Sequence, residues 1–143
     1  LVKIKLGLSK CLYLGNLDAK RDWGHAKDFV YMQWKILQQK KPDDFVIATG
    51  KSLSVREFII KVSKYLNIKI TFKGKGLNEK GYDDNGNVIV RVRNVYFRAK
   101  DVDNLVGDSK KAKKILNWKP KYKIEDIIKE MVDHDYKVLK DKK

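Results

Sequence analysis

Residues 12–28 read Leu-Tyr-Leu-Gly-Asn-Leu-Asp-Ala-Lys-Arg-Asp-Trp-Gly-His-Ala-Lys-Asp, and the fold prediction for this 143-residue chain starts from them. The apolar run 12–14 predicts a short strand that stops at Gly15-Asn16, a pair typical of a turn. A polar loop then carries Arg21 into the start of a helix. An arginine fork matches phosphate oxygens, and a helix N-terminus adds backbone N–H groups, so this stretch suits a phosphate-bearing ligand.

The chain is strongly basic. Its net charge is +15, from 33 basic and 18 acidic residues, which makes nucleic acid a candidate partner. The acidic residues are interleaved along the chain and the excess is mostly lysine, which favours a solvated surface and no nucleic acid. A chain of this length forms one domain with a sizeable core.

The composition also bears on redox chemistry, metals and membranes. Cys11 is the only cysteine, which excludes an intramolecular disulfide. No His and carboxylate set has metal-ligand spacing, so we predict no metal. No apolar run approaches the roughly 18 residues of a membrane span, and we expect a soluble cytoplasmic protein. Because the chain begins without a methionine and within a predicted helix, we expect a piece of a longer protein.

The first third of the chain predicts helix, strand, helix and strand. Residues 1–7 predict a helix end at Gly7, and residues 25–40 predict a helix that ends before Pro42. The apolar run 44–49 predicts a strand buried on both faces. The expected apolar face of the 25–40 helix consists of Ala26, Phe29, Val30, Trp34 and Leu37. We expect core positions for two tryptophans, Trp34 on this helix and Trp118 further along the chain.

The remaining elements follow local signals. Ser54-Val-Arg-Glu57 is a capping box that begins a helix with an apolar face at 55, 58, 59, 62 and 66. Residues 68–72 predict a strand, and Asn85-Gly86 predicts a hairpin turn before a returning strand at 88–92. We expect residues 96–97 to be strand-like. Asp108 is a plausible N-cap for a helix through residue 116, and a long helix follows from residue 124.

Several blocks of the sequence resemble the GDP-mannose 4,6-dehydratases, a family of the extended short-chain dehydrogenases/reductases. The resemblance begins in residues 12–28 and continues in family order through nearly the whole chain. Its further blocks are Pro42-Asp-Asp-Phe-Val-Ile-Ala-Thr-Gly50, Ser54-Val-Arg-Glu-Phe58, 96–103 and 107–120.

The resemblance implies an α/β fold, the C-terminal part of a Rossmann-type enzyme. Residues 1–50 would contribute a helix and a strand to the Rossmann-type sheet and the substrate loop. Residues 51–143 would form the nucleotide-sugar subdomain, with helices and a small sheet or hairpin. The whole enzyme would use NADP to convert GDP-mannose to GDP-4-keto-6-deoxymannose, in the GDP-fucose pathway. It would act as a dimer or tetramer.

The family's glycine-rich dinucleotide turn and its catalytic Thr, Tyr and Lys have no counterpart here. Tyr65-Leu-Asn-Ile-Lys69 has the spacing of the catalytic dyad but spans a predicted helix end and strand start, so we interpret it as coincidence. We therefore predict no catalytic residue in this chain and an inactive fragment.

The resemblance assigns substrate contacts to particular positions. Arg21 and Arg98 would bind the diphosphate, with surface ion pairs to Asp18, Asp22 or Asp101 as the alternative. Asp101 stands where the family has Glu, which puts its nucleoside contact in doubt. Two residues at the strand end complete the predicted set: Gly15, for which a turn role is favoured, and Asn16, for which turn and ligand roles are equally open. We expect His25 to bond backbone or a carboxylate rather than act as a general base.

Three alternatives remain from the sequence. In the first alternative the chain belongs to another nucleotide-sugar epimerase or dehydratase, which predicts a preference for UDP over GDP. In the second it is a basic nucleic-acid-binding domain, which predicts an affinity that falls steeply with salt. In the third it is only a structural or oligomerisation piece.

Overall fold

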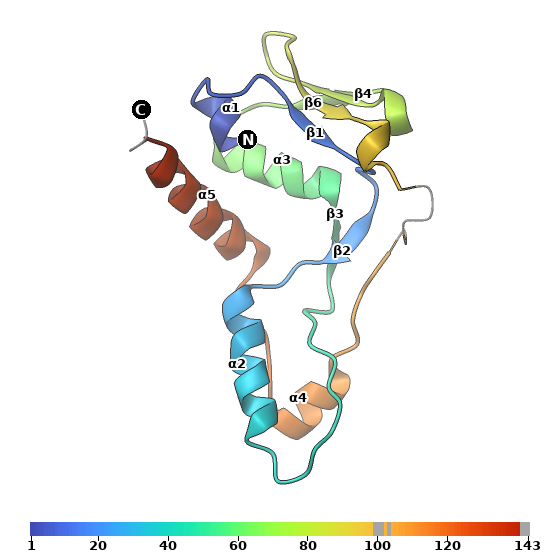
Figure 1. Ribbon diagram of the computed structural model, residues 1–143, viewed down its shortest axis with the longest axis vertical. Helices are drawn as coiled ribbons and strands as arrows, with labels where there is room; N and C mark the ends of the chain where they lie inside the picture. Colours follow the sequence, from blue (N-terminus) through green and yellow to red (C-terminus); the bar gives the residue numbers. More distant parts are fainter. Residues whose placement is uncertain (99–101, 103, 141–143) are drawn as a thin grey trace.

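The computed structural model describes residues 1–98, 102 and 104–140. Figure 1 shows an elongated molecule in which a sheet with α1, α3 and α5 forms one end, and α2, α4 and the loop after α2 form the other. The short strands β2 (Lys20–Asp22) and β3 (Ser52–Ser54) join the two ends as an antiparallel pair. The sequence predicted a polar loop where β2 lies.

The larger sheet has four strands in the order β1-β6-β5-β4. β1 (Leu12–Leu14) runs parallel to β6 (Val88–Val92), and β5 (Lys80–Tyr82) and β4 (Thr71–Lys73) continue the sheet in antiparallel fashion. The predicted strands 12–14 and 88–92 are confirmed. The predicted strand 68–72 is shorter and later than expected, and β5, which sequence patterns did not reveal, is the partner of β6 across the hairpin.

The hairpin turn between β5 and β6 forms as predicted. Gly86 has a φ of 77°, in the left-handed region that favours glycine. The Asp83 carboxylate accepts hydrogen bonds from the backbone N–H groups of Asn85 and Asn87 at 2.9 and 2.8 Å. These bonds satisfy the turn backbone, and they lower the pKa of Asp83 together with the Asn87 side chain, which contributes most.

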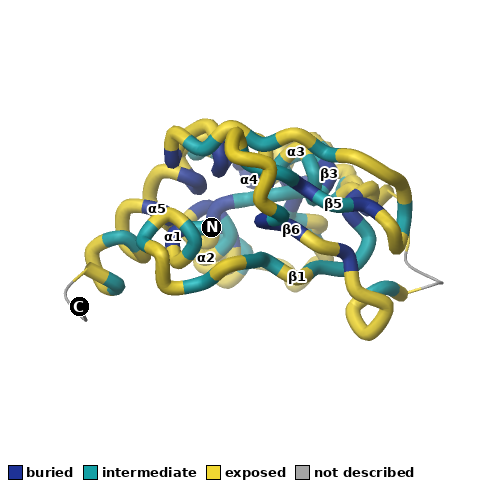
Figure 2. The backbone as a smooth tube through the Cα atoms, turned by 90° about the horizontal axis from the view of Figure 1, so that it is seen from above, coloured by how far each residue is buried: buried dark blue, intermediate teal, exposed yellow. Residues whose placement is uncertain are grey.

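Helix α3 (Val55–Tyr65) covers one face of the sheet. The predicted capping box is confirmed: the Ser54 hydroxyl accepts from the Glu57 N–H, and the Glu57 carboxylate accepts from the Ser54 N–H. Ile59 packs with the inward-facing residues of β1 and β6. Viewed from above, buried positions lie among the strands and α3 and also around α4 and α5 (Figure 2).

Helices α1 (Val2–Lys5) and α5 (Ile124–Lys140) pack together with α3. Their shared core consists of Val2, Val62, Leu66, Ile128 and Val132. No helix in the described part of the chain is both long enough and apolar enough to cross a membrane.

At the other end, α2 (Ala26–Leu37) packs against α4 (Lys110–Leu116). Met32, Ala112, Leu116 and Trp118 form this core, so the core prediction for Trp118 is confirmed. The predicted apolar face of α2 is wrong: Val30, Trp34 and Leu37 are exposed, and the helix buries Asp28 and Met32 instead. The pattern identified apolar residues, but the neighbour of α2 lies on another side of the helix.

Three further predictions differ from the structure. Residues 44–49 form no strand, because no described strand lies beside them; Phe45, Ile47 and Ala48 pack as a loop instead. Residues 96–97, expected to be strand-like, form no strand: Tyr96 ends a 3₁₀ turn, η2 (Asn94–Tyr96). The N-cap of α4 is Ser109, although the Asp108 carboxylate does accept from the Lys110 N–H at 2.9 Å. A second 3₁₀ turn, η1 (Gly76–Asn78), precedes β5.

Candidate functional site

Gly15 follows β1 directly and lies against the backbone of η2. A Cβ atom on this glycine would stand 2.1 Å from the Tyr96 carbonyl oxygen. The sequence analysis explained Gly15 by turn conformation, but its φ is not positive, and the glycine is required by this close approach. Any larger residue would push η2 away from β1.

Asn16 closes a tight turn. Its Oδ1 accepts a hydrogen bond from the Asp18 N–H at 2.9 Å, the geometry of an Asx turn. The turn role of Asn16 is therefore present in the structure, and its ligand role stays a prediction.

Arg21 lies in β2, opposite Leu53 of β3. Its Nη1 donates to the carbonyl oxygens of Lys20 and Val102 at 2.8 and 2.7 Å. The acids proposed as its ion-pair partners are engaged elsewhere, because Asp18 contacts Arg56 and Asp22 accepts from Thr49 and Gly50. The Arg21 side chain is thus directed to the segment that follows η2.

Described residues before and after Arg98 contact residues 14–21. The Arg93 N–H donates to the Leu14 carbonyl at 2.9 Å, and the Leu105 N–H donates to the Lys20 carbonyl at 3.2 Å. Asn104 also forms a parallel bridge with Lys20. Arg98 lies between these contacts and is exposed. The structure therefore brings Arg93, Val102, Asn104 and Leu105, which flank Arg98 in the chain, against residues 14–21. The ligand role of Arg98 stays a prediction, and Asp101 lies outside the described residues.

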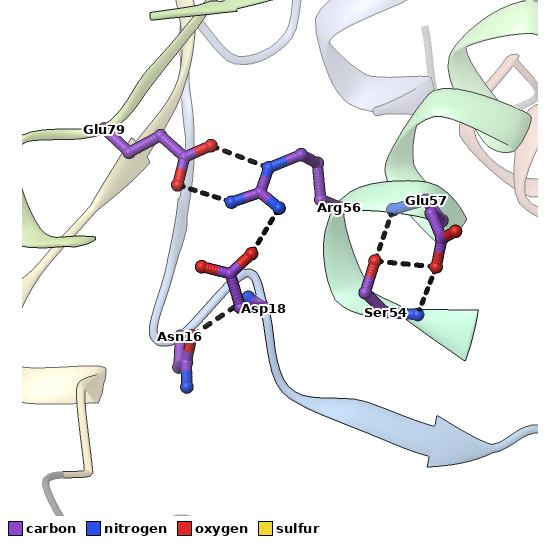
Figure 3. Close-up of polar contacts among 6 residues, drawn as sticks. All are labelled: Asn16, Asp18, Ser54, Arg56, Glu57 and Glu79. Carbon is purple, nitrogen blue, oxygen red and sulfur yellow. Dashed lines mark hydrogen bonds and ion pairs between the residues drawn. The ribbon is translucent and has the colours of Figure 1, made fainter. Parts of the chain in front are cut away.

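Arg56 contacts two carboxylates, as Figure 3 shows. Its Nε and Nη2 donate to the two carboxylate oxygens of Glu79 at 2.7 and 2.8 Å, and its Nη1 contacts Asp18. The hydrogen bond from Arg56 holds the pKa of Asp18 below its usual range. The hydrogen bonds to Glu79, and to a lesser extent the bond to Asp18, raise the pKa of Arg56. No local sequence pattern predicts these pairs, because the partners are distant in the chain.

His25 caps the N-terminus of α2. Its Nδ1 accepts from the Lys27 N–H at 3.1 Å, its Nε2 lies 3.2 Å from Glu130 Oε2, and its ring stacks on Tyr122. The prediction that His25 bonds backbone or a carboxylate is confirmed on both counts. A cap that uses one ring nitrogen as acceptor leaves the other as the donor to Glu130.

Asp28 is a buried carboxylate that sequence reasoning missed. It accepts from the Lys121 N–H at 3.1 and 3.0 Å and from the Tyr122 N–H at 3.1 Å. These bonds tie the first turn of α2 to the segment that leads into α5. An acidic residue in the first turn of a helix was the available signal, but its partners lie about ninety residues away in the chain.

An apolar cavity of the described chain lies away from the predicted ligand residues. A cavity of about 300 Å³ between α3, α5 and β1 is apolar, with Leu12, Trp23 and Phe58 in its lining, and Gly15, Asn16, Arg21 and Arg98 are not part of that lining. Within residues 1–98, 102 and 104–140, no three His, Cys, Asp or Glu side chains gather as metal ligands.

The chain does not fit a dinucleotide cofactor. The sequence has no G-x-G-x-x-G turn. The nearest pattern, Gly74-Lys-Gly76, has Glu79 at its third glycine position, and this carboxylate is buried against Arg56. A buried carboxylate would repel a pyrophosphate, so we derive no chemistry through such a group from these residues.

Solved structures with the same arrangement define the class of protein. A Pseudomonas aeruginosa protein, RMD, solved with NADPH, has a TM-score of 0.74 at 14% identity over 95% of this chain and 39% of its own. A UDP-glucose 4-epimerase from Stenotrophomonas maltophila has a TM-score of 0.66 at 16% identity over 99% of this chain and 39% of its own. The fold is the C-terminal part of the Rossmann-type extended short-chain dehydrogenase/reductase fold.

Sequence relatives narrow the class to a family. The profile of the family described as GDP-mannose 4,6 dehydratase matches residues 1–131. GDP-mannose 4,6-dehydratases from Vibrio cholerae and Homo sapiens are each 48% identical to the chain over 96% of its length. The chain belongs to the GDP-mannose 4,6-dehydratase family, as the resemblance indicated. It spans 40% and 37% of those two relatives.

Proposed function

We propose that this chain is the substrate-binding part of a GDP-mannose 4,6-dehydratase, a lyase that converts GDP-mannose to GDP-4-keto-6-deoxymannose for GDP-fucose biosynthesis. The observation that supports the proposal is that Arg93, Val102 and Leu105, which flank Arg98 in the chain, form hydrogen bonds with residues 14–21. A diphosphate brings close to two negative charges, which two arginine forks from adjacent segments can meet.

In this proposal the remaining predicted residues assist the two arginines. Asn16 lies at the end of β1, where the nucleotide would pass. Gly15 allows η2 to approach β1 closely, so that η2 would form one side of the binding site. Asp101 would contact the nucleoside with a side chain one methylene shorter than the family's Glu.

The hydride-transfer machinery belongs to another part of the enzyme in this proposal. NADP, in the family the source and acceptor of the hydride, would bind outside this chain. Residues 1–50 would supply the exposed stripe of α2 and the loop 44–49 to the Rossmann-type sheet, with residues 51–143 as the nucleotide-sugar subdomain. We expect the intact protein to be a cytoplasmic homo-oligomer, and the 143-residue chain alone to show no turnover of GDP-mannose.

Calorimetric titration of the purified chain with GDP tests the proposal. Arg21→Ala and Arg98→Ala are each expected to weaken binding about tenfold or more, because a charge-assisted hydrogen bond contributes about 1.5–3 kcal/mol. Arg91→Ala is the matched control: it removes the same charge from an exposed position of β6, and GDP affinity should stay within about twofold.

Each other outcome of the titration has a definite meaning. Equal losses in all three variants would show general charge attraction and favour the nucleic-acid alternative, with its steep salt dependence. Tighter binding of UDP than of GDP would assign the chain to a different nucleotide-sugar substrate. No binding of GDP would overturn the proposal that these two segments suffice for the site, and would leave family membership intact.

A further inference from the structure

We propose that Arg56 is a positioning residue for the segment 15–22, here called the ligand loop. It would fix the ligand loop on α3 before the ligand arrives, so that Asn16 and Arg21 are held in one arrangement. The inference deepens the proposed function and rests on it for the identity of the ligand. The fixing of the loop itself rests on the contacts below.

The first step is that the guanidinium of Arg56 has one allowed orientation. Glu79 is only 4% exposed, and a carboxylate so far from water requires a cation and hydrogen-bond donors. Arg56 meets it with two parallel N–H groups at 2.7 and 2.8 Å. A bidentate pair fixes the plane of the guanidinium, so the direction of its remaining Nη1 is fixed too.

The second step is that this fixed Nη1 contacts the ligand loop. It donates to the Asp18 carboxylate, which Figure 3 shows between Arg56 and Asn16. The side chain of Asp18 is 68% exposed, so it is held by this contact and not by burial.

The third step is that the backbone on either side of Asp18 is fixed by the same helix. The Val55 N–H donates to the Ala19 carbonyl at 3.2 Å, and the Arg56 N–H donates to the Leu17 carbonyl at 2.9 Å. These are first-turn N–H groups of α3, which have no partner within a helix. Leu17 and Ala19 are also buried. Three consecutive residues of the ligand loop are thus held by the start of α3.

The predicted ligand residues flank this fixed point. Asn16 accepts from the Asp18 N–H, so its turn depends on where Asp18 stands. Arg21 follows two residues after Ala19, in β2. A loop that is ordered before binding loses less conformational entropy when the ligand binds, which increases affinity without any contact between Arg56 and the ligand.

Substitution of Asp18 tests the positioning of the ligand loop without a large change in the stability of the fold. An exposed ion pair contributes little to the free energy of unfolding, so Asp18→Asn should leave the fold intact. Glu125→Gln is the matched control, because it removes another exposed carboxylate, 63% exposed, that pairs with Lys61 of α3 at 2.8 Å. Arg56→Lys keeps the charge but removes the fork.

The experiment combines amide hydrogen exchange of residues 15–22 in the free chain, GDP titration and urea unfolding. Asp18→Asn should speed exchange in the ligand loop and raise the Kd for GDP about threefold to tenfold, with the urea midpoint unchanged. Arg56→Lys should do the same to the loop and also lower the midpoint. Glu125→Gln should change neither loop exchange nor GDP affinity.

The possible failures are distinguishable. Unchanged loop exchange in both Asp18→Asn and Arg56→Lys would overturn the positioning role. Faster exchange with unchanged GDP affinity would overturn the proposal that the fixing of the loop by Arg56 increases the affinity for the ligand. Faster exchange in a chain whose unsubstituted form binds no GDP would support the fixing of the loop by Arg56 and overturn the proposed function instead.

Discussion

α2 and α3 are helices of similar length, and each carries an apolar stripe that is visible in the sequence. In α3 the predicted stripe is the buried one, with Ile59 and Val62 in the core. In α2 the predicted stripe faces outward, with Trp34 55% and Leu37 80% exposed. The comparison teaches that periodicity reveals an apolar face, whereas burial depends on which segments lie beside the helix.

The largest effect is expected in α3. Ile59→Ala removes a buried side chain that packs on β1 and β6, and should lower the free energy of unfolding by about 2–5 kcal/mol. Urea unfolding followed by circular dichroism measures this loss. A loss below about 1 kcal/mol would mean that the α3 stripe is no better packed than that of α2.

The buried side of α2 gives the next effect. Asp28→Asn replaces one acceptor oxygen by an amide group that faces the N–H donors of Lys121 and Tyr122, and should cost about 1–3 kcal/mol. Asp44→Asn, at an exposed position, is the control and should be neutral. Equal stability of both variants would show that α2 is not tied to the 121–122 segment through Asp28.

The cap of α3 gives a smaller effect with a pH signature. Ser54→Ala should cost about 1 kcal/mol at neutral pH. Bonds from the Ser54 N–H and hydroxyl lower the pKa of Glu57, so its stabilisation is present above its unfolded pKa and is lost as the pH falls through the folded value. The difference in the free energy of unfolding between the unsubstituted chain and Ser54→Ala should therefore become smaller at acid pH. A difference independent of pH would contradict the hydrogen bond from the Ser54 hydroxyl to the Glu57 carboxylate.

The smallest effect is expected on the outer face of α2. Leu37→Gln should change the free energy of unfolding of this chain by no more than about 0.5 kcal/mol, because the side chain is exposed. The same urea measurement serves here. A loss comparable to that of Ile59→Ala would show that the α2 stripe is covered in solution by another copy of the chain.

Local signals predicted the parts of the fold that depend on neighbours in sequence. The capping box at Ser54, the turn at Gly86 and the long last helix each use contacts within a few residues. The strand predicted at 44–49 failed because a strand requires a partner, and sequence patterns do not say whether one is present. β2 and β5 were missed because their three residues each are too short to show alternation.

The ligand roles of Arg21 and Arg98 came from the resemblance and stay predictions. The side chains that support the Arg21 loop could not be predicted from the sequence. The Arg56–Glu79 pair spans 23 residues and the Arg56–Asp18 pair spans 38. Pairs at such distances leave no period or motif in a single sequence.

The parallel pairing of β1 with β6 has a consequence for the synthesis of the protein on the ribosome. Leu12 pairs with Val90, so 78 residues must be added before β1 can find its neighbour. At about 5–20 residues per second, a ribosome needs about 4–16 s for that length. During this interval β1 lacks the strand beside which it lies in the folded chain, so its pairing must wait until β6 has been made.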